Sequence, residues 1–236
     1  MSSEIYILDL LGTFTFAIYG VHVAIKKGFD IFGIFVCAFL TALGGGTLRE
    51  LILNHTPFYF YDMNYIYAVL LGIITSIVIY QVFSKINKYM LVVDAVGLST
   101  FALIGSVKAD EAELGFFAIV FFAPLTAAGG GIVRDIAIRE IPKLFYSDFY
   151  ASPAIFLGVV YALWGKEYPN SAFIYILLLT TFALRVMAMN RNVNLWGPWI
   201  KDHKSKKPII NFPFKFKTKS PAASKFLFAL KKALLG

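Results

Sequence analysis

Two short stretches of the sequence combine three consecutive glycines with an arginine and an acid, inside otherwise apolar segments: TALGGGTLRE at 41–50 and TAAGGGIVRD at 126–135. Glycine costs about 1 kcal/mol relative to alanine in a helix interior, and an arginine at the centre of a membrane helix costs ~2.5–3.5 kcal/mol. Both stretches carry the cost of the glycines and the cost of the arginine, so we expect the interior of the helix bundle to be polar. The candidate residues are Gly44, Gly45, Gly46, Gly129, Gly130, Gly131, Arg49, Glu50, Arg134 and Asp135.

The glycine triplets are expected to bend or locally unwind the helices that carry them. Unwound backbone in hydrocarbon leaves amide groups unpaired at several kcal/mol each, so it survives only beside protein or water. Each arginine is expected to be held by an acid or by carbonyl groups freed at the bend. The alternative is that the small residues permit close helix packing and that the arginines only pair locally.

Further polar residues lie at helical spacing in two other apolar segments. Steps of three and four residues place Asp94 and Lys108 on one helical face, and Asp9 begins a matching stripe near the N-terminus. We interpret these residues as possible pathway-lining or gating groups. The alternatives are acids hydrated at helix ends, a lysine that snorkels, and threonines that bond their own backbone. The candidates are Asp9, Asp94, Thr41, Thr126 and Lys108.

The composition is that of an integral membrane protein. Of 236 residues, 58% are hydrophobic and 15% are charged, and the mean hydropathy is +0.71. Soluble domains are nearer half apolar and a quarter charged. We therefore predict an all-α membrane protein with seven transmembrane helices, because several windows approach the ~20 apolar residues that cross a bilayer. The predicted spans are roughly 5–25, 31–53, 64–83, 89–108, 114–138, 152–165 and 171–189.

An internal repeat relates two parts of the chain at an offset of 85 residues, without a gap between residues 9 and 61. Arg49 matches Arg134, and Asp9 matches Asp94. Each copy holds three predicted spans, so the second copy enters the bilayer from the opposite side and the two form a 3+3 inverted repeat. The seventh span is a candidate for oligomer contacts or bracing. The predicted divisions are a first three-helix repeat at 1–88, a second, inverted repeat at 89–170, a seventh helix at 171–190 and a basic tail at 191–236.

Basic residues predict the orientation in the membrane. Cytoplasmic ends are enriched in lysine and arginine, and here they concentrate after the first, third and fifth spans and in the tail. We expect the N-terminus outside and the C-terminus in the cytoplasm. The tail explains the net charge of +8, and its segment 224–235 has lysines between apolar residues at helical spacing. We interpret it as a membrane-surface or solvated segment, and expect no nucleic-acid partner.

The duplicated GGG-x-x-R-[DE], the 3+3+1 span count and the basic tail resemble the prokaryotic branch of the TRIC family, the trimeric intracellular cation channels. The resemblance covers about residues 5–190. It implies a homotrimer in the cell membrane, among membrane lipids, that passes monovalent cations, chiefly potassium. The pathway would lie within each subunit, between the two repeats, and the glycine kinks of helices two and five would shape it.

Two other functions remain open from the sequence. A secondary transporter of a small solute by alternating access also suits inverted repeats with broken helices. A non-transporting scaffold is the third possibility, which the duplicated intramembrane charges disfavour. No enzyme motif, zinc cluster or phosphate loop stands out and the three histidines do not cluster, so we expect no enzyme, cofactor or metal.

Overall fold

The structure, a computed structural model, describes residues 3–83, 87–145, 149–165 and 171–191. These residues form seven α-helices and two short 3₁₀ helices. The α-helices are α1 (Ser3–Lys26), α2 (Ile31–Ile52), α3 (Asn64–Phe83), α4 (Asn87–Glu111), α5 (Gly115–Ala137), α6 (Ser152–Trp164) and α7 (Ser171–Arg191), and the 3₁₀ helices are η1 (Phe58–Phe60) and η2 (Lys143–Phe145).

The seven predicted helices are confirmed, with ends that differ from the prediction by a few residues. Within the described residues, α1, α2, α4, α5 and α7 are long and apolar enough to cross a membrane, whereas α3 and α6 contribute shorter apolar segments. The described residues all belong to one compact unit, Met1–Leu195. Apart from Arg191, the predicted basic tail at 191–236 lies outside the described residues.

The ends of α2 and α5 show that the sequence repeat extends to backbone conformation. Asn54 follows α2 with a φ of 57°, and Arg139 follows α5 with a φ of 58°. In each case the next amide donates to a carbonyl five residues earlier, that of Glu50 or of Asp135, at 2.8 Å. A left-handed residue followed by such a hydrogen bond satisfies a free carbonyl and stops a helix. The two helices therefore end in the same way at the same repeat positions.

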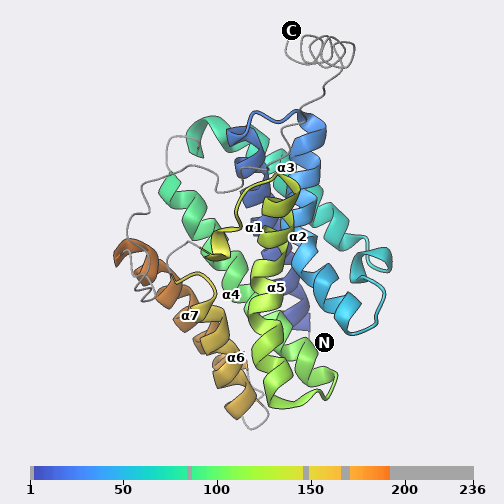
Figure 1. Ribbon diagram of the computed structural model, residues 1–236, viewed down its shortest axis with the longest axis vertical. Coiled ribbons are helices and arrows are strands. Elements are labelled where there is room, and N and C mark those ends of the chain that lie inside the picture. Colours follow the sequence, from blue (N-terminus) through green and yellow to red (C-terminus); the bar gives the residue numbers. More distant parts are fainter. Residues whose placement is uncertain (1–2, 84–86, 146–148, 166–170, 192–236) are drawn as a thin grey trace, which may run out of the picture. The chain divides into compact units, whose positions relative to one another are not determined.

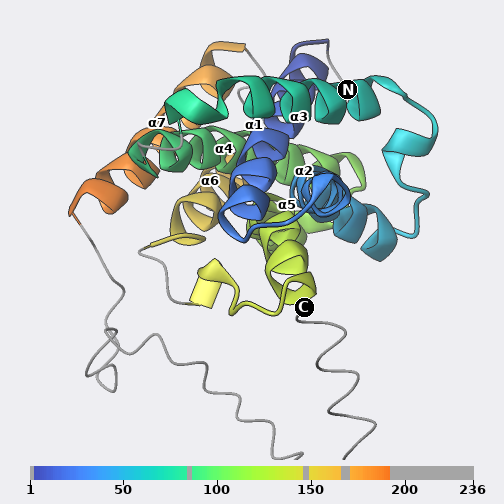
Figure 2. The same cartoon turned by 90° about the horizontal axis from the view of Figure 1, so that it is seen from above.

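Helices α1 and α4 lie side by side in the interior, and the other helices pack around them (Figures 1 and 2). The α1–α4 contact contains an edge-to-face pair, Phe16 and Phe101, with ring centroids 4.9 Å apart. A Cβ atom at Gly12 would lie 2.8 Å from the Phe101 ring, and one at Gly97 would lie 2.2 Å from the Phe16 ring. Small residues therefore make room for each ring on the facing helix.

Successive helices run back and forth along the long axis of Figure 1. The α1–α2 connection lies at the upper end of that view, and the α4–α5 connection lies at the lower end. Helix α2 packs against both α1 and α5, and α7 packs against α4 and α6. This arrangement places the two glycine-bearing helices in contact with each other.

Candidate functional site

The two glycine triplets meet where α2 and α5 cross, and we call this contact the glycine crossing. The glycines that face the opposite helix are Gly44, Gly45, Gly129 and Gly130, whereas a Cβ atom at Gly46 would meet Phe58 and one at Gly131 would meet Arg134 and Tyr150. A Cβ atom at Gly45 would lie 2.1 Å from the carbonyl oxygen of Thr126, and one at Gly130 would lie 2.2 Å from the carbonyl oxygen of Thr41. Only residues without a side chain permit such an approach of backbone to backbone.

The expected unwinding at the glycine triplets is wrong. Helices α2 and α5 are α-helical without interruption through the crossing. Because the two helices pack directly on each other and keep their helical hydrogen bonds, no unpaired backbone has to be accommodated. The close-packing alternative therefore describes the triplets, and a bend of the intact helices stays a prediction.

Each motif arginine forms a buried ion pair with the acid that follows it. Nε and Nη2 of Arg49 donate to Oε1 of Glu50 at 2.9 and 2.6 Å. The same two nitrogens of Arg134 donate to Oδ1 of Asp135 at the same distances. None of the four residues is more than 7% exposed. The prediction that an acid holds each arginine is confirmed, and the pairing offsets the charge of each guanidinium group.

The two arginines differ in their other neighbours. Arg49 lies over the ring of Phe58, 5.7 Å from the ring centroid, whereas Arg134 lies 5.4 Å from the centroid of Tyr19. Nη1 of Arg134 also donates to Oγ1 of Thr41 at 3.3 Å, which joins α5 to α2 beside the crossing. The polar interactions of the two repeat copies are therefore similar but not identical.

The two candidate acids lie inside the helix bundle. Asp9 is 4% exposed and Asp94 is 2% exposed, so the alternative that they are hydrated at helix ends is wrong. The hydroxyl of Tyr65 donates to Oδ2 of Asp9 at 2.9 Å, and the hydroxyl of Tyr150 donates to Oδ1 of Asp94 at 3.1 Å. Both tyrosines escaped the sequence analysis, although they obey the 85-residue offset and extend the repeat.

The remaining candidates fall into two groups. Thr41 and Thr126 are buried, and Oγ1 of Thr41 donates to the carbonyl oxygen of Cys37 at 2.6 Å. Oγ1 of Thr126 is a buried atom without a hydrogen-bond partner among the described residues. Lys108 lies in the last turn of α4 with a partly exposed side chain, and it forms an ion pair with Glu111 at 2.8 Å. Lys108 is therefore a helix-end residue outside the buried ion pairs.

Arg185 of α7 is a buried charged residue that the sequence analysis missed. It is 1% exposed, its Nη2 lies 3.9 Å from Oδ2 of Asp94, and its guanidinium carbon lies 4.5 Å from the ring centroid of Tyr150. An arginine within an apolar span signals a functional position, and this signal was available in the sequence. Oligomer contact or bracing by the seventh span stays a prediction, and Arg185 adds to it a polar contact between α7 and α4.

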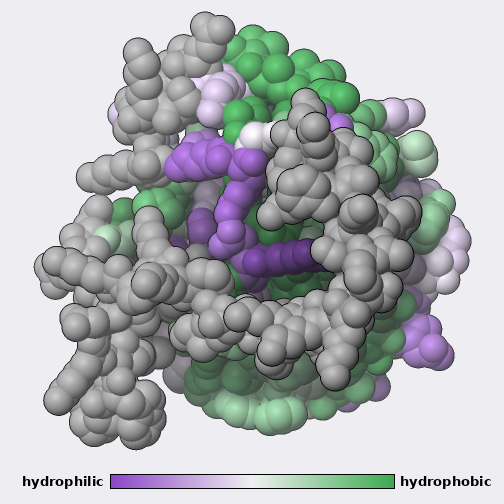
Figure 3. Space-filling view, turned by 45° about the horizontal axis from the view of Figure 1, so that its top comes forward, coloured by the Kyte–Doolittle hydropathy of each residue, from purple (hydrophilic) through white to green (hydrophobic). Residues whose placement is uncertain are grey.

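Hydrophilic side chains gather on the face drawn in Figure 3, between apolar surfaces. Lys27 forms an exposed ion pair with Glu140, which links the residue after α1 to the chain after α5. The side chain of Lys143 bonds the hydroxyl of Tyr19. The two contacts hold together parts of the chain that are distant in sequence. Among the described residues, no group of three or more potential ligands is placed to hold a metal ion.

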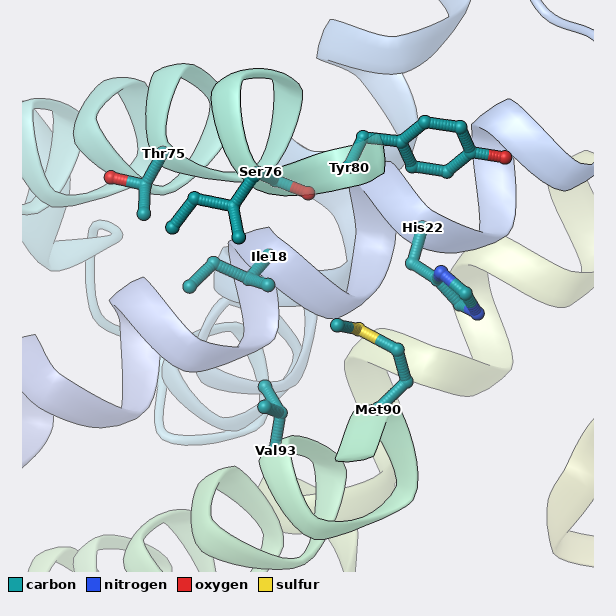
Figure 4. A pocket seen from close by; sticks show the side chains of 8 residues that line it. Ile18, His22, Thr75, Ser76, Tyr80, Met90 and Val93 are labelled. Atoms are coloured by element: carbon teal, nitrogen blue, oxygen red, sulfur yellow. The ribbon is translucent and has the colours of Figure 1, made fainter. Parts of the chain in front are cut away.

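A small cavity of about 90 Å³ lies between α1, α3 and α4 (Figure 4), and none of its described lining residues belongs to α2 or α5. Apolar atoms make up most of its surface, and His22 and Tyr80 are the ionisable residues among the described lining. The cavity contains neither the motif arginines nor the buried acids. It therefore does not mark the candidate site.

Comparisons with known proteins agree with this architecture. A family model described as glycine transporter matches residues 6–81 and, separately, residues 91–166. The UPF0126 inner membrane protein YadS of Escherichia coli K12 is 41% identical over 160 residues, which are 67% of this chain and 77% of that protein. A UPF0126 membrane protein of Vibrio cholerae is 32% identical over 197 residues, which are 82% of each chain.

Solved structures with the same fold include TRIC channels. One, from work on conductance through TRIC cation channels, has a TM-score of 0.75 at 32% identity and covers 86% of this chain and 100% of that chain. The trimeric intracellular cation channel orthologue from Rhodobacter sphaeroides has a TM-score of 0.72 at 27% identity and covers 81% of this chain and 100% of that chain. The fold is that of an all-helical membrane protein of the TRIC type.

Proposed function

The chain belongs to the UPF0126 family of TRIC-like membrane proteins, and from this premise we propose that it is a cation channel that prefers potassium. The observation that carries the proposal is its similarity to solved TRIC cation channels along nearly their whole length. Its relatives are membrane proteins and channels, and like them it is not an enzyme.

The proposed pathway lies within each subunit, between two inverted three-helix repeats. The recurrence of contacts at the repeat offset supports this arrangement: the tyrosine–aspartate hydrogen bonds, the arginine–acid pairs and the ends of α2 and α5 all obey it. In this proposal the first repeat is 1–88, the second is 89–170, the seventh helix is 171–190 and the tail is 191–236.

The charges of the candidate site are compatible with passage of a cation. Buried arginines would repel a cation, but each motif arginine is paired with its own acid. The carboxylates of Asp9 and Asp94 and the hydroxyl groups of Thr41 and Thr126 supply oxygen atoms, which are the ligands that hard cations prefer. The glycine crossing shapes the pathway by holding α2 and α5 together.

A second function is a transporter of glycine by alternating access. The description of the matching family model favours this candidate, and inverted repeats suit both functions. The two functions give different signals in an assay: a channel gives unitary currents, whereas a transporter gives saturable flux of the solute. A single preparation can therefore be tested for both.

The protein is proposed to reside in the cell membrane as a homotrimer, surrounded by lipids, with the N-terminus outside and the C-terminus in the cytoplasm. The name of the YadS relative as an inner membrane protein supports the location, and the trimeric TRIC orthologue supports the assembly. A Ser2→Cys variant in a Cys37→Ala background tests the orientation by labelling with an impermeant maleimide. Labelling of intact cells supports the proposal, and labelling only after lysis contradicts it.

Purified protein in planar bilayers tests the channel, and proteoliposomes from the same preparation test the transporter. We expect discrete current steps whose reversal potential follows the potassium gradient. Radiolabelled glycine should enter these proteoliposomes no faster than protein-free liposomes. Saturable glycine uptake without unitary currents would replace the channel with the transporter.

A further inference from the structure

The two buried carboxylates that obey the repeat differ in their counter-charges. Asp94 accepts a hydrogen bond from Tyr150 and also has Nη2 of Arg185 at 3.9 Å. Asp9 accepts the matching hydrogen bond from Tyr65, at 2.9 Å. Since α7 stands outside the repeat, Arg185 breaks the equivalence of the two sites.

Within the described part of the chain, no basic side chain forms an ion pair with Asp9. Arg49 attracts the Asp9 carboxylate electrostatically, but it donates both Nε and Nη2 to Glu50. Lys108, at the end of α4, is paired with Glu111. The Asp9 carboxylate is thus 4% exposed and bonded to a single hydroxyl group.

A buried carboxylate is costly unless a positive charge and hydrogen bonds compensate it. At Asp94 the protein supplies that charge through the Arg185 ion pair, and Lys143 and Arg134 also attract this carboxylate. At Asp9 a bound cation would serve the same purpose, held by carboxylate oxygens and the tyrosine hydroxyl. Oxygen donors of this kind suit a hard cation, and one carboxylate balances a single positive charge.

We propose that Asp9 and Tyr65 form a binding site for a monovalent cation. At Asp94 the guanidinium group of Arg185 takes the place of that cation. The inference rests on the proposed cation pathway. It predicts one cation-binding site along that pathway, at Asp9, and none at Asp94. Removal of the Arg185 charge should then turn the Asp94–Tyr150 pair into a second cation site.

Thallous ion is the probe, because it is a heavy monovalent cation that anomalous scattering locates in crystals of the purified protein. We expect Tl⁺ beside Asp9 in the wild type and none beside Asp94. The Asp9→Asn variant should lose the ion. Arg185→Gln should gain Tl⁺ at Asp94, and the matched Asp94→Asn/Arg185→Gln variant should lose this second ion but keep the first.

Thermal unfolding provides a second measurement for variants that do not crystallise. A ligand that binds only the folded protein raises Tm, and the rise grows as the ligand concentration increases relative to Kd. Replacing N-methyl-D-glucamine chloride by KCl should raise the Tm of the wild type and of Asp94→Asn/Arg185→Gln, but not that of Asp9→Asn. Equal Tm shifts in the wild type and both variants, or Tl⁺ absent from Asp9, would overturn the inference.

Single-channel recordings separate failure of this site from failure of the proposed function. Asp9→Asn should lower the conductance at low potassium by about tenfold, because it removes a charge that attracts the cation. Currents of Asp9→Asn that equal those of the wild type would refute the cation site but not the channel. Absence of wild-type currents, with Tl⁺ bound at Asp9, would refute the channel and leave the site.

Discussion

Substitution of single glycines in the crossing tests whether α2 and α5 depend on backbone contact. In the Gly45→Ala variant the new methyl group would start 2.1 Å from the carbonyl oxygen of Thr126. Carbon–oxygen contacts are comfortable at about 3.3 Å, so the two helices must separate by about 1.2 Å. Both sides of this contact are backbone, and no flexible side chain can move aside.

Overpacking of this kind costs about 1–3 kcal/mol. For a chain of this length, 1 kcal/mol shifts Tm by about 2–4 °C, so a loss of about 2 kcal/mol lowers Tm by about 4–8 °C. Gly131→Ala is the matched control, because its nearest neighbours would lie at 3.8 and 3.9 Å. Its gain in helix propensity, about 1 kcal/mol, should leave Tm unchanged or slightly raised.

Thermal unfolding of the detergent-solubilised variants, followed by tryptophan fluorescence, measures these shifts. Gly45→Ala and Gly130→Ala should each lower Tm, and the double variant should lose less than the sum. The reason is that both methyl groups act on one crossing, so the first substitution already opens the space for the second. Equal tolerance of alanine at Gly45 and Gly131, or full additivity in the double variant, would refute the close contact.

Three other substitutions test individual contacts. Glu50→Gln removes the negative charge that balances the buried Arg49 guanidinium and should cost about 3–5 kcal/mol. Arg49→Met with Glu50→Met removes both charges and should cost less, so equal losses in thermal unfolding would contradict this. A double-mutant cycle of Phe16→Leu and Phe101→Leu should give a coupling of about 0.5–1.5 kcal/mol, and independent effects would deny the edge-to-face contact. Lys27→Ala removes an exposed ion pair and should cost less than about 1 kcal/mol in the same unfolding assay, so a larger loss would assign the pair a structural role.

The helices could be predicted because the length of each apolar segment is a local property. The observed α-helices agree with the predicted spans to within a few residues, and the arginine–acid pairs were predictable because the partners are adjacent in sequence. The internal repeat was also visible, since identical residue types recur at one offset. Tyr65 and Tyr150 also occupy matching positions of the repeat, so equivalent roles for them could have been predicted from the sequence.

The state of the glycine triplets could not be predicted from local propensity. Three glycines favour a weakened helix, but packing of α2 on α5 supplies the interactions that keep both helices intact. The intrinsic preference amounts to about 1 kcal/mol per residue, which a tertiary contact readily offsets. The error arose because the sequence shows each triplet alone, whereas the structure places them against each other.

The sequence by itself determined the membrane character, the helices, the repeat and the local pairing of the motif charges, since each depends on composition or on residues close in the chain. Only the tertiary structure decided which polar groups meet. It placed Arg185 of α7 beside Asp94, whereas the hydrogen bond described for Asp9 comes from the Tyr65 hydroxyl. The physical reason is that charges interact through space. Which charged groups are close enough to interact therefore depends on how the helices pack, and not on their order in the sequence.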